Sequence, residues 1–247
     1  MFIGEYWFNE FEIENTTING YAFFRDEDLY LYSPIDGVLG IVADGAVKIG
    51  DATTNYAGFD PTGHLTFNAA ARPWRDEIGE LVGIKKKGVR ITEDLDEGTV
   101  VFSNACQIAD DWIVVNVQLN HDKDLTASIY PHLHWFQETT YKPNWLLKYR
   151  WQVNGGSKIA DWTSITLSHA VFTFSGITLN QISSCSEIAV PVGSTLSDIV
   201  QFKIMRDTDN DSGLFTGNDA VTGNVAALMF DCHFMLNSCG STDEYTK

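Results

Sequence analysis

The fold is decided by the stretch SIYPHLHWFQETTYKPNWLLKYRWQVN, residues 128–154. Two runs rich in aromatic and branched side chains flank a turn-forming cluster, Lys142-Pro143-Asn144, as in two antiparallel strands. Similar runs follow and precede them: TVVFSNA (99–105), WIVVNVQLN (112–120), WTSITLSHAVFTFSG (162–176), DIVQFKIMRD (198–207) and NVAALMFDCHFMLN (224–237). No amphipathic helical pattern intervenes, so the sequence predicts an all-β protein with a jelly-roll-like antiparallel sandwich.

Composition limits the function classes. The chain has 247 residues, a size that suits one main β domain with an extension, and 44% of them are hydrophobic. Its net charge of -17 would repel a phosphate backbone, which argues against nucleic-acid partners. The start, MFIGEYWFNEFEIEN, lacks a basic region followed by an apolar one, and no apolar run is long enough to span a bilayer. We therefore expect no signal peptide and no membrane partner.

The residues before the sandwich divide into two parts. Residues 1–36 mix aromatic with acidic side chains and predict an extended arm that packs on its own domain or on a neighbouring subunit. Residues 37–84 contain short apolar runs closed by glycine-bearing turns, which predicts small hairpins for oligomerisation or attachment. Within this part, residues 68–83 could form a short helix or an irregular linker. The sandwich is expected over residues 85–247.

The four cysteines are scattered without metal-ligand spacing. They are Cys106, Cys185, Cys232 and Cys239. We expect reduced, mostly buried thiols rather than disulfides.

Three segments, in a fixed order, carry a resemblance to a known family. They are DGVLGIVADGAVKIGD with NYAGFDPTGHLTF and ARPWRDE, then IYPHLHWFQ with NWLLKYRWQVNGG, and finally FDCHFMLNSCGSTDEYTK after IMRDTDND. In this order they resemble virion structural proteins that tailed bacteriophages encode among their head and tail genes. The resemblance covers residues 36–247 and implies a structural role in the virion, without catalytic residues or cofactors.

The resemblance leaves the position in the particle open. A capsid decoration or cement protein attached to the major capsid protein is the first expectation, and a receptor-binding protein among tail or fibre components is the alternative. Surface and fibre proteins of such particles commonly trimerise, so a homotrimer is expected. The assembly contacts are expected at the aromatic residues of the arm and at one lysine cluster: Phe2, Tyr6, Trp7, Phe8, Phe11, Tyr30, Tyr32, Lys85, Lys86 and Lys87.

A histidine pair is the clearest candidate for chemistry. His132 and His134 alternate along an expected strand and therefore project from one face, as two metal ligands would. Glu138 follows at the spacing of the cupin metal motif, which makes a cupin-like metal enzyme a second alternative. The glycines that flank such a motif are absent, so we favour histidines hydrogen-bonded across strands. His233 could join the pair only if its strand lies alongside.

An acidic loop offers a second metal candidate. Asp207, Asp209 and Asp211 in RDTDNDSG alternate like the ligands of a calcium loop. Ser212 stands where the turn glycine belongs and Asn218 where the bidentate glutamate belongs. We favour a solvated turn that Asx side chains stabilise without metal.

Lysines and tryptophans complete the candidates for binding. Residues 85–87, KKK, are the one basic cluster, and they predict either an acidic neighbouring subunit or a soluble hairpin tip. The tryptophans of the sandwich are expected mainly in its core, and exposed ones would be a host-glycan surface: Trp112, Trp135, Trp145, Trp151 and Trp162.

Overall fold

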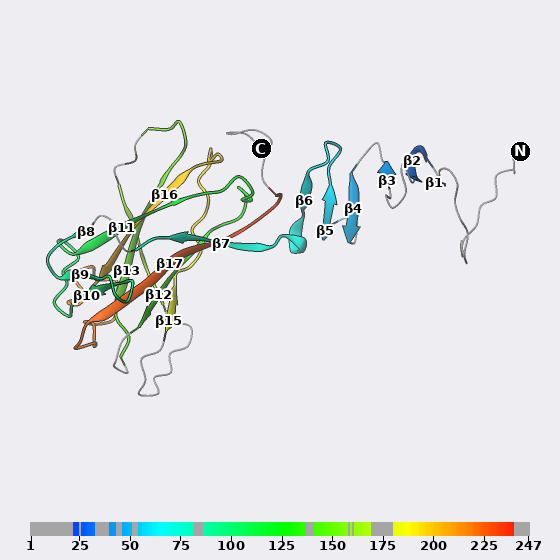
Figure 1. The fold of residues 1–247 in the computed structure, drawn as a ribbon. Helices are drawn as coiled ribbons and strands as arrows, with labels where there is room; N and C mark the ends of the chain where they lie inside the picture. The colour runs from blue at the N-terminus through cyan, green and yellow to red at the C-terminus, as the bar shows by residue number, and fades with distance from the viewer. Residues whose placement is uncertain are drawn as a thin grey trace, which may run out of the picture.

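The computed structural model describes residues 46–50, 54–81, 86–136, 141–157, 159, 161–168 and 180–239, together with the backbone of 22–24, 26–32 and 40–42. These residues form antiparallel sheets joined by turns and one 3-10 turn, so the predicted all-β fold is confirmed. Figure 1 shows a sandwich at one end and a row of short strands, β1–β6, that leads away from it.

Two sheets make the sandwich. Sheet I has the order β15-β12-β17-β10-β9, with β7 also paired to β17, and sheet II has the order β14-β13-β16-β11-β8. The strands of sheet I are β7 (Trp74–Gly79), β9 (Ile91–Asp94), β10 (Thr99–Phe102), β12 (Tyr130–Phe136), β15 (Gln181–Ser184) and β17 (Val225–Met235). Those of sheet II are β8 (Lys86–Lys87), β11 (Trp112–Gln118), β13 (Trp145–Gln152), β14 (Thr163–Thr166) and β16 (Ile199–Arg206).

The connectivity is that of a jelly roll. Counting from β10 to β17, sheet I pairs the first, eighth, third and sixth strands, and sheet II pairs the second, seventh, fourth and fifth. Successive strands therefore alternate between the sheets, except at β13 and β14, and every recorded pairing is antiparallel. The predicted jelly-roll-like sandwich is thus confirmed by its strand order.

Alternating side chains produce the core. Along β12 the residues are half-buried and buried in turn, so Leu133 and Trp135 face sheet II while His132 and His134 face outward. The space between the sheets is filled by apolar side chains from both, with Trp135, Trp145 and Trp151 among them. The expectation that most of these tryptophans are core residues is confirmed.

The sandwich begins earlier than expected. β7 pairs over its whole length with β17, from Trp74 opposite Met235 to Gly79 opposite Phe230. The sandwich therefore includes residues 74–79, which the sequence-based division assigned to the preceding segment. For residues 68–83 the sequence left a short helix or an irregular linker open, and the described residues show one 3-10 turn, η1 (Ala69–Ala71), after which the chain extends to pair with β17.

Six short strands precede the sandwich. They are β1 (Ala22–Phe24), β2 (Asp26–Tyr32), β3 (Gly40–Val42), β4 (Val47–Gly50), β5 (Tyr56–Phe59) and β6 (Leu65–Phe67). β1–β3 form one sheet and β4–β6 another. The glycine turns predicted small hairpins such as β4–β6, whereas β1 and β2 form a hairpin within residues that the sequence assigned to the extended arm. β6 is tied to the chain after β17, because Phe67 N–H donates to Asn237 O at 2.8 Å and Cys239 N–H to Leu65 O at 3.3 Å.

The thiols differ in exposure. Cys106, Cys185 and Cys232 are buried and free, and Cys239 is exposed and free, as the sequence predicted. Burial raises the pKa of Cys106 to about 11 and that of Cys185 to about 12, and holds the pKa of Cys232 well above its usual range.

Because the thiolate is the reactive form, we expect Ellman's reagent at pH 8 to modify Cys239 rapidly and the other three only on unfolding. Rapid modification of a Cys239→Ser variant would contradict this.

Candidate functional site

A cluster of histidine and aspartate side chains lies on the outer face of sheet I. β12 and β17 are neighbours there, and their register sets His132 opposite Asp231. On the other side of β17, β7 sets Asp76 opposite His233. Alternation along each strand turns these side chains to the same face. Three strands that are far apart in sequence therefore contribute to one cluster.

The side-chain atoms of this cluster lie close together. Nδ1 of His132 is 3.2 Å from Nε2 of His233 and 3.5 Å from Oδ1 of Asp231. Nε2 of His233 is 3.7 Å from Oδ1 of Asp231 and 2.8 Å from Oδ1 of Asp76. Among the described residues, His132, Asp231 and His233 form the one group of three ligand-bearing side chains that converge closely enough to share an ion.

Only one of the two carboxylate oxygens of Asp231 accepts a hydrogen bond within the described residues. The residue is 3% exposed, and its Oδ2 lies 3.0 Å from Nε2 of His134, which donates to it. Its Oδ1 is buried and accepts no hydrogen bond from any of the described residues. A buried carboxylate oxygen without a donor is costly in a folded protein, which marks this atom as one that calls for a further partner.

His132 is poised in its neutral form. Burial lowers its pKa from the ordinary histidine value, and the neighbouring His233 lowers that pKa further, while Asp231 opposes both effects. A neutral imidazole keeps a lone pair on one ring nitrogen, which is the form that binds a cation.

The structure changes the composition of the predicted histidine site. His132 and His134 do share one face, as expected, and His233 does lie alongside, but Glu138 falls outside the described residues. Both histidines point away from the space between the sheets, where the ligands of a cupin-like centre would have to point. Sequence reasoning missed Asp231 and Asp76. The alternation in Asp231-Cys232-His233 was a signal, but only strand register joins it to His132.

The acidic loop is organised by its own backbone. Asp207 is buried, and its carboxylate accepts hydrogen bonds from the N–H groups of Asp211 and Ser212 and from the Ser212 hydroxyl. Asp209 and Asp211 are exposed. This arrangement corresponds to the Asx-stabilised turn that we favoured over a calcium loop.

Of the predicted lysine cluster, Lys87 stands opposite Trp112 on the outer face of sheet II, whereas Lys86 stands opposite the buried Ile113. Lys85 is outside the described residues, Lys86 pairs with Glu93 at 3.8 Å and Lys87 with Asp110 at 3.0 Å. Further cations line this face from β13 and β16, where Lys148 stands directly opposite Lys203. Nζ of Lys203 lies 4.6 Å from the ring centres of both half-buried outer tryptophans, Trp112 and Trp162. These two rings are therefore covered by the chain's own lysine.

The remaining predicted assembly residues are placed only in part. Phe2, Tyr6, Trp7, Phe8 and Phe11 lie outside the described residues. The backbone of Tyr30 and Tyr32 belongs to β2.

One face of the β4–β6 sheet is wholly apolar. The register aligns Val47 with Phe59 and Leu65, and Ile49 with Ala57 and Phe67, so all of these side chains share one face. None of them is buried: Ile49 is 70% and Phe59 is 46% exposed. The opposite face carries Lys48, Tyr56 and Thr66, with Nζ of Lys48 4.4 Å from the ring centre of Tyr56. From here on, the arm means the strands β1–β6. The surface formed by Val47, Ile49, Ala57, Phe59, Leu65 and Phe67 is called the apolar arm face.

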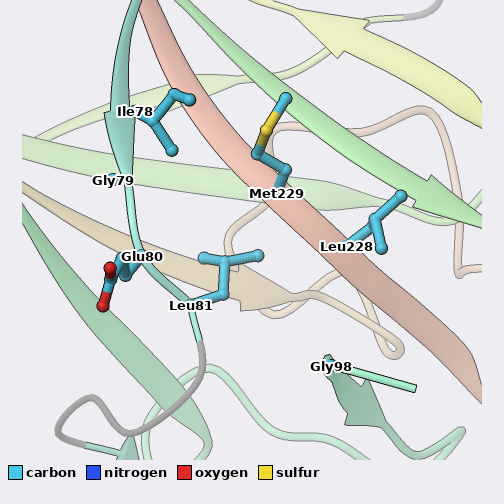
Figure 2. Close-up of a pocket in the computed structure, with 7 residues that line it drawn as sticks. All are labelled: Ile78, Gly79, Glu80, Leu81, Gly98, Leu228 and Met229. Carbon is cyan, nitrogen blue, oxygen red and sulfur yellow. The ribbon is translucent and has the colours of Figure 1, made fainter.

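A shallow hollow lies where β17 changes partner. β17 pairs with β10 up to Ala227 and with β7 from Phe230 onward, and the gap between these partners leaves a hollow of about 220 Å³. Figure 2 shows its lining: Ile78, Gly79, Glu80, Leu81, Gly98, Leu228 and Met229. Small-molecule sites usually measure roughly 300–1,000 Å³ and contain convergent polar groups. Glu80 is the one titratable side chain in this described lining, so the hollow offers no catalytic arrangement.

Comparisons with known proteins yield two distant structural matches to report. No family model matches the sequence, and no curated protein matches it significantly. The enzymatically active domain of tailspike protein 4 from bacteriophage CBA120 aligns at 12% identity and a TM-score of 0.29, over 66% of this chain and 19% of that domain. The mannan-recognising carbohydrate-binding module TmCBM27 aligns at 10% identity and a TM-score of 0.29, over 65% of this chain and 88% of the module.

These matches extend no function to the chain. It spans about a fifth of the tailspike domain's length, and TM-scores this low do not establish a shared fold. No helix in the described part of the chain is both long and apolar enough to cross a membrane.

Proposed function

We propose that the chain is a non-enzymatic structural protein of a tailed-phage particle, a homotrimeric capsid decoration protein whose sandwich is carried on an assembling arm. The observation that carries this proposal is the apolar arm face. The ordered resemblance of residues 36–247 to virion proteins gives the assembly its context. A tail or fibre position would use the same arm, and in either place the partners are other virion proteins.

The apolar arm face requires a partner. A three-stranded sheet of three- and four-residue strands cannot build a core of its own. On its apolar face Ile49 and Phe59 are exposed, and the other branched and aromatic side chains are half-buried. Removing this apolar surface from water stabilises an assembly in proportion to the area that becomes buried. A second copy of the chain offers an equally apolar face, and three copies around an axis enclose a shared core.

The distribution of charge favours self-association at this face. Each chain has a net charge of -17, which opposes the approach of copies along most of the surface. The apolar arm face carries no charged side chain, because Lys48 points to the opposite side of the sheet. Figure 1 shows this sheet away from the body of the sandwich, so copies can meet at this uncharged face without bringing their sandwiches together.

A carboxylate added to the apolar arm face should abolish trimerisation and leave the fold of the single chain intact. Ile49→Asp places a charge on the apolar arm face at a residue that is 70% exposed in the single chain, so the monomer keeps its structure. In the trimer the same carboxylate is buried with its symmetry copies, which is strongly unfavourable. We expect light scattering after size exclusion to give a trimer for the wild type and a monomer for Ile49→Asp.

The matched control is Thr66→Asp. It adds the same charge to the opposite face of the same sheet and should leave the trimer intact. A monomeric wild type at micromolar concentration, or equal loss of trimer in both variants, would refute the proposal. Electron microscopy of virions that carry the Ile49→Asp chain then shows whether trimerisation is needed for its place on the particle.

A further inference from the structure

Hydrogen bonding alone does not account for the geometry of the His132, Asp231, His233 and Asp76 cluster. A ring nitrogen carries at most one hydrogen. If His132 Nδ1 and His233 Nε2 both carry one, two N–H groups face each other at 3.2 Å. If His132 Nδ1 carries none, Asp231 Oδ1 stays buried without a donor. If His132 Nδ1 carries one and His233 Nε2 none, the bare Nε2 faces the carboxylate oxygen Oδ1 of Asp76 at 2.8 Å. Each of these states leaves either a repulsion or an unsatisfied oxygen, whereas a cation among these atoms removes both.

The spacing of the atoms matches the edges of a tetrahedron. Metal–ligand distances of about 2.0–2.1 Å, typical of Zn²⁺ with nitrogen and oxygen ligands, place neighbouring ligands about 3.3 Å apart. The edges among His132 Nδ1, His233 Nε2 and Asp231 Oδ1 are 3.2, 3.5 and 3.7 Å. Asp76 Oδ1 lies 2.8 Å from His233 Nε2 but outside the group of three that already converges, and its side chain is 55% exposed, so it reaches the fourth position by rotation of that side chain.

We propose that His132, Asp231, His233 and Asp76 bind one tetrahedral first-row divalent cation, Zn²⁺. Two imidazoles and two carboxylates suit zinc, whereas calcium and magnesium prefer a shell of oxygen ligands. Two carboxylates also balance the charge of the ion. His134 is a positioning residue, because its bond to Asp231 Oδ2 leaves Oδ1 turned toward the cation.

The ion joins three strands at the root of the arm. Asp76 belongs to β7, His132 to β12, and Asp231 and His233 to β17. β7 is the first sandwich strand after the arm. Arg72, just before β7, already pairs with Asp124, and Arg75, within β7, pairs with Asp122. Zinc would therefore fasten the arm to the sandwich as a structural ion with four protein ligands. This role is independent of the virion assignment.

The wild-type chain provides the first measurement. Untagged full-length protein is stripped with a chelator, titrated with Zn²⁺ by calorimetry, and assayed for metal by elemental analysis. We expect about one equivalent of zinc per chain and a higher melting temperature with zinc, because the folded state alone has the assembled site. Co²⁺ in place of zinc should give the intense visible absorption bands of tetrahedral coordination, a readout that needs no variant.

Substitutions distinguish the residues that bind the metal from the residues that lie near it. His233→Gln and Asp231→Asn should abolish stoichiometric binding, and His134→Gln should weaken it about 10- to 100-fold, as loss of an outer partner does. The control is His64→Gln, since His64 also lies 3.5 Å from a carboxylate, that of Asp60, but no third ligand-bearing side chain among the described residues converges on this pair. Its zinc affinity should equal that of the wild type.

Three outcomes would overturn the proposal. They are a stripped wild type that takes up no stoichiometric zinc, a Co²⁺ spectrum of octahedral type, and a folded His233→Gln variant with unchanged affinity. None of them affects the trimer measurement, so the two proposals fail separately.

Discussion

Replacing Arg206 by methionine is expected to lower the free energy of unfolding by about 3–5 kcal/mol, the usual cost of breaking a buried ion pair from one side. Arg206 is fully buried at the end of β16 and donates from Nε to Oδ2 of Asp219 at 2.8 Å. Its Nη1 donates to the carbonyls of Phe102 and Gly223, and its Nη2 to that of Val221. The substitution leaves a buried carboxylate and three carbonyl groups without this donor.

Urea denaturation of the wild type and of Arg206→Met measures the loss in the free energy of unfolding. The control is Arg150→Met on β13, where the guanidinium is half-exposed and bonds to Gln201 and Ile159. We expect a loss below about 1 kcal/mol there, as for other surface interactions. Similar losses for the two variants would show that Arg206 does not organise the chain between β16 and β17.

Removal of the Trp145 side chain is expected to cause the second large loss in the free energy of unfolding. Trp145 is completely buried between the sheets, with its ring 5.1 Å from that of Phe102 and 6.4 Å from that of Trp135. Its indole N–H donates to none of the described residues, so the contribution of this side chain to stability comes from packing. We expect Trp145→Ala to lower the free energy of unfolding by about 3–5 kcal/mol, the range for large aromatic residues in cores.

A tryptophan on the outer face gives the comparison. Trp162 is half-buried, and cations lie over its ring rather than core side chains. Trp162→Ala should cost clearly less than Trp145→Ala in the same urea experiment, because no closed cavity forms. A larger loss for Trp162 would mean that the outer face of sheet II contributes more to stability than the core.

The fold class followed from local pattern. The alternation in residues 112–118 and 130–136 indicated strands with one face in the core, and these became β11 and β12. Glycine turns in residues 37–67 indicated small hairpins, and β4–β6 have that form. The segment at 74–79 was misassigned because its letters, WRDEIG, show no strand alternation, and only pairing with β17 makes it a strand.

The candidate site followed from pattern only in part. The spacing of His132 and His134 indicated one shared face, but it could not show that His134 would bond to Asp231 rather than complete the group of three. Asp76 gave no local signal at all. It reaches the cluster because β7 runs beside β17.

By itself, the sequence determined which way each side chain turns, because a strand repeats every two residues whatever its neighbours are. That was enough for an all-β sandwich, its core tryptophans and a histidine pair that shares one face. Only the tertiary structure decided which strands lie side by side and in what register, since those pairings join residues about a hundred positions apart, as His132 and His233 are. The zinc cluster and the apolar arm face both arise from register, and register is set by the summed burial of a whole sheet rather than by any local run of residues.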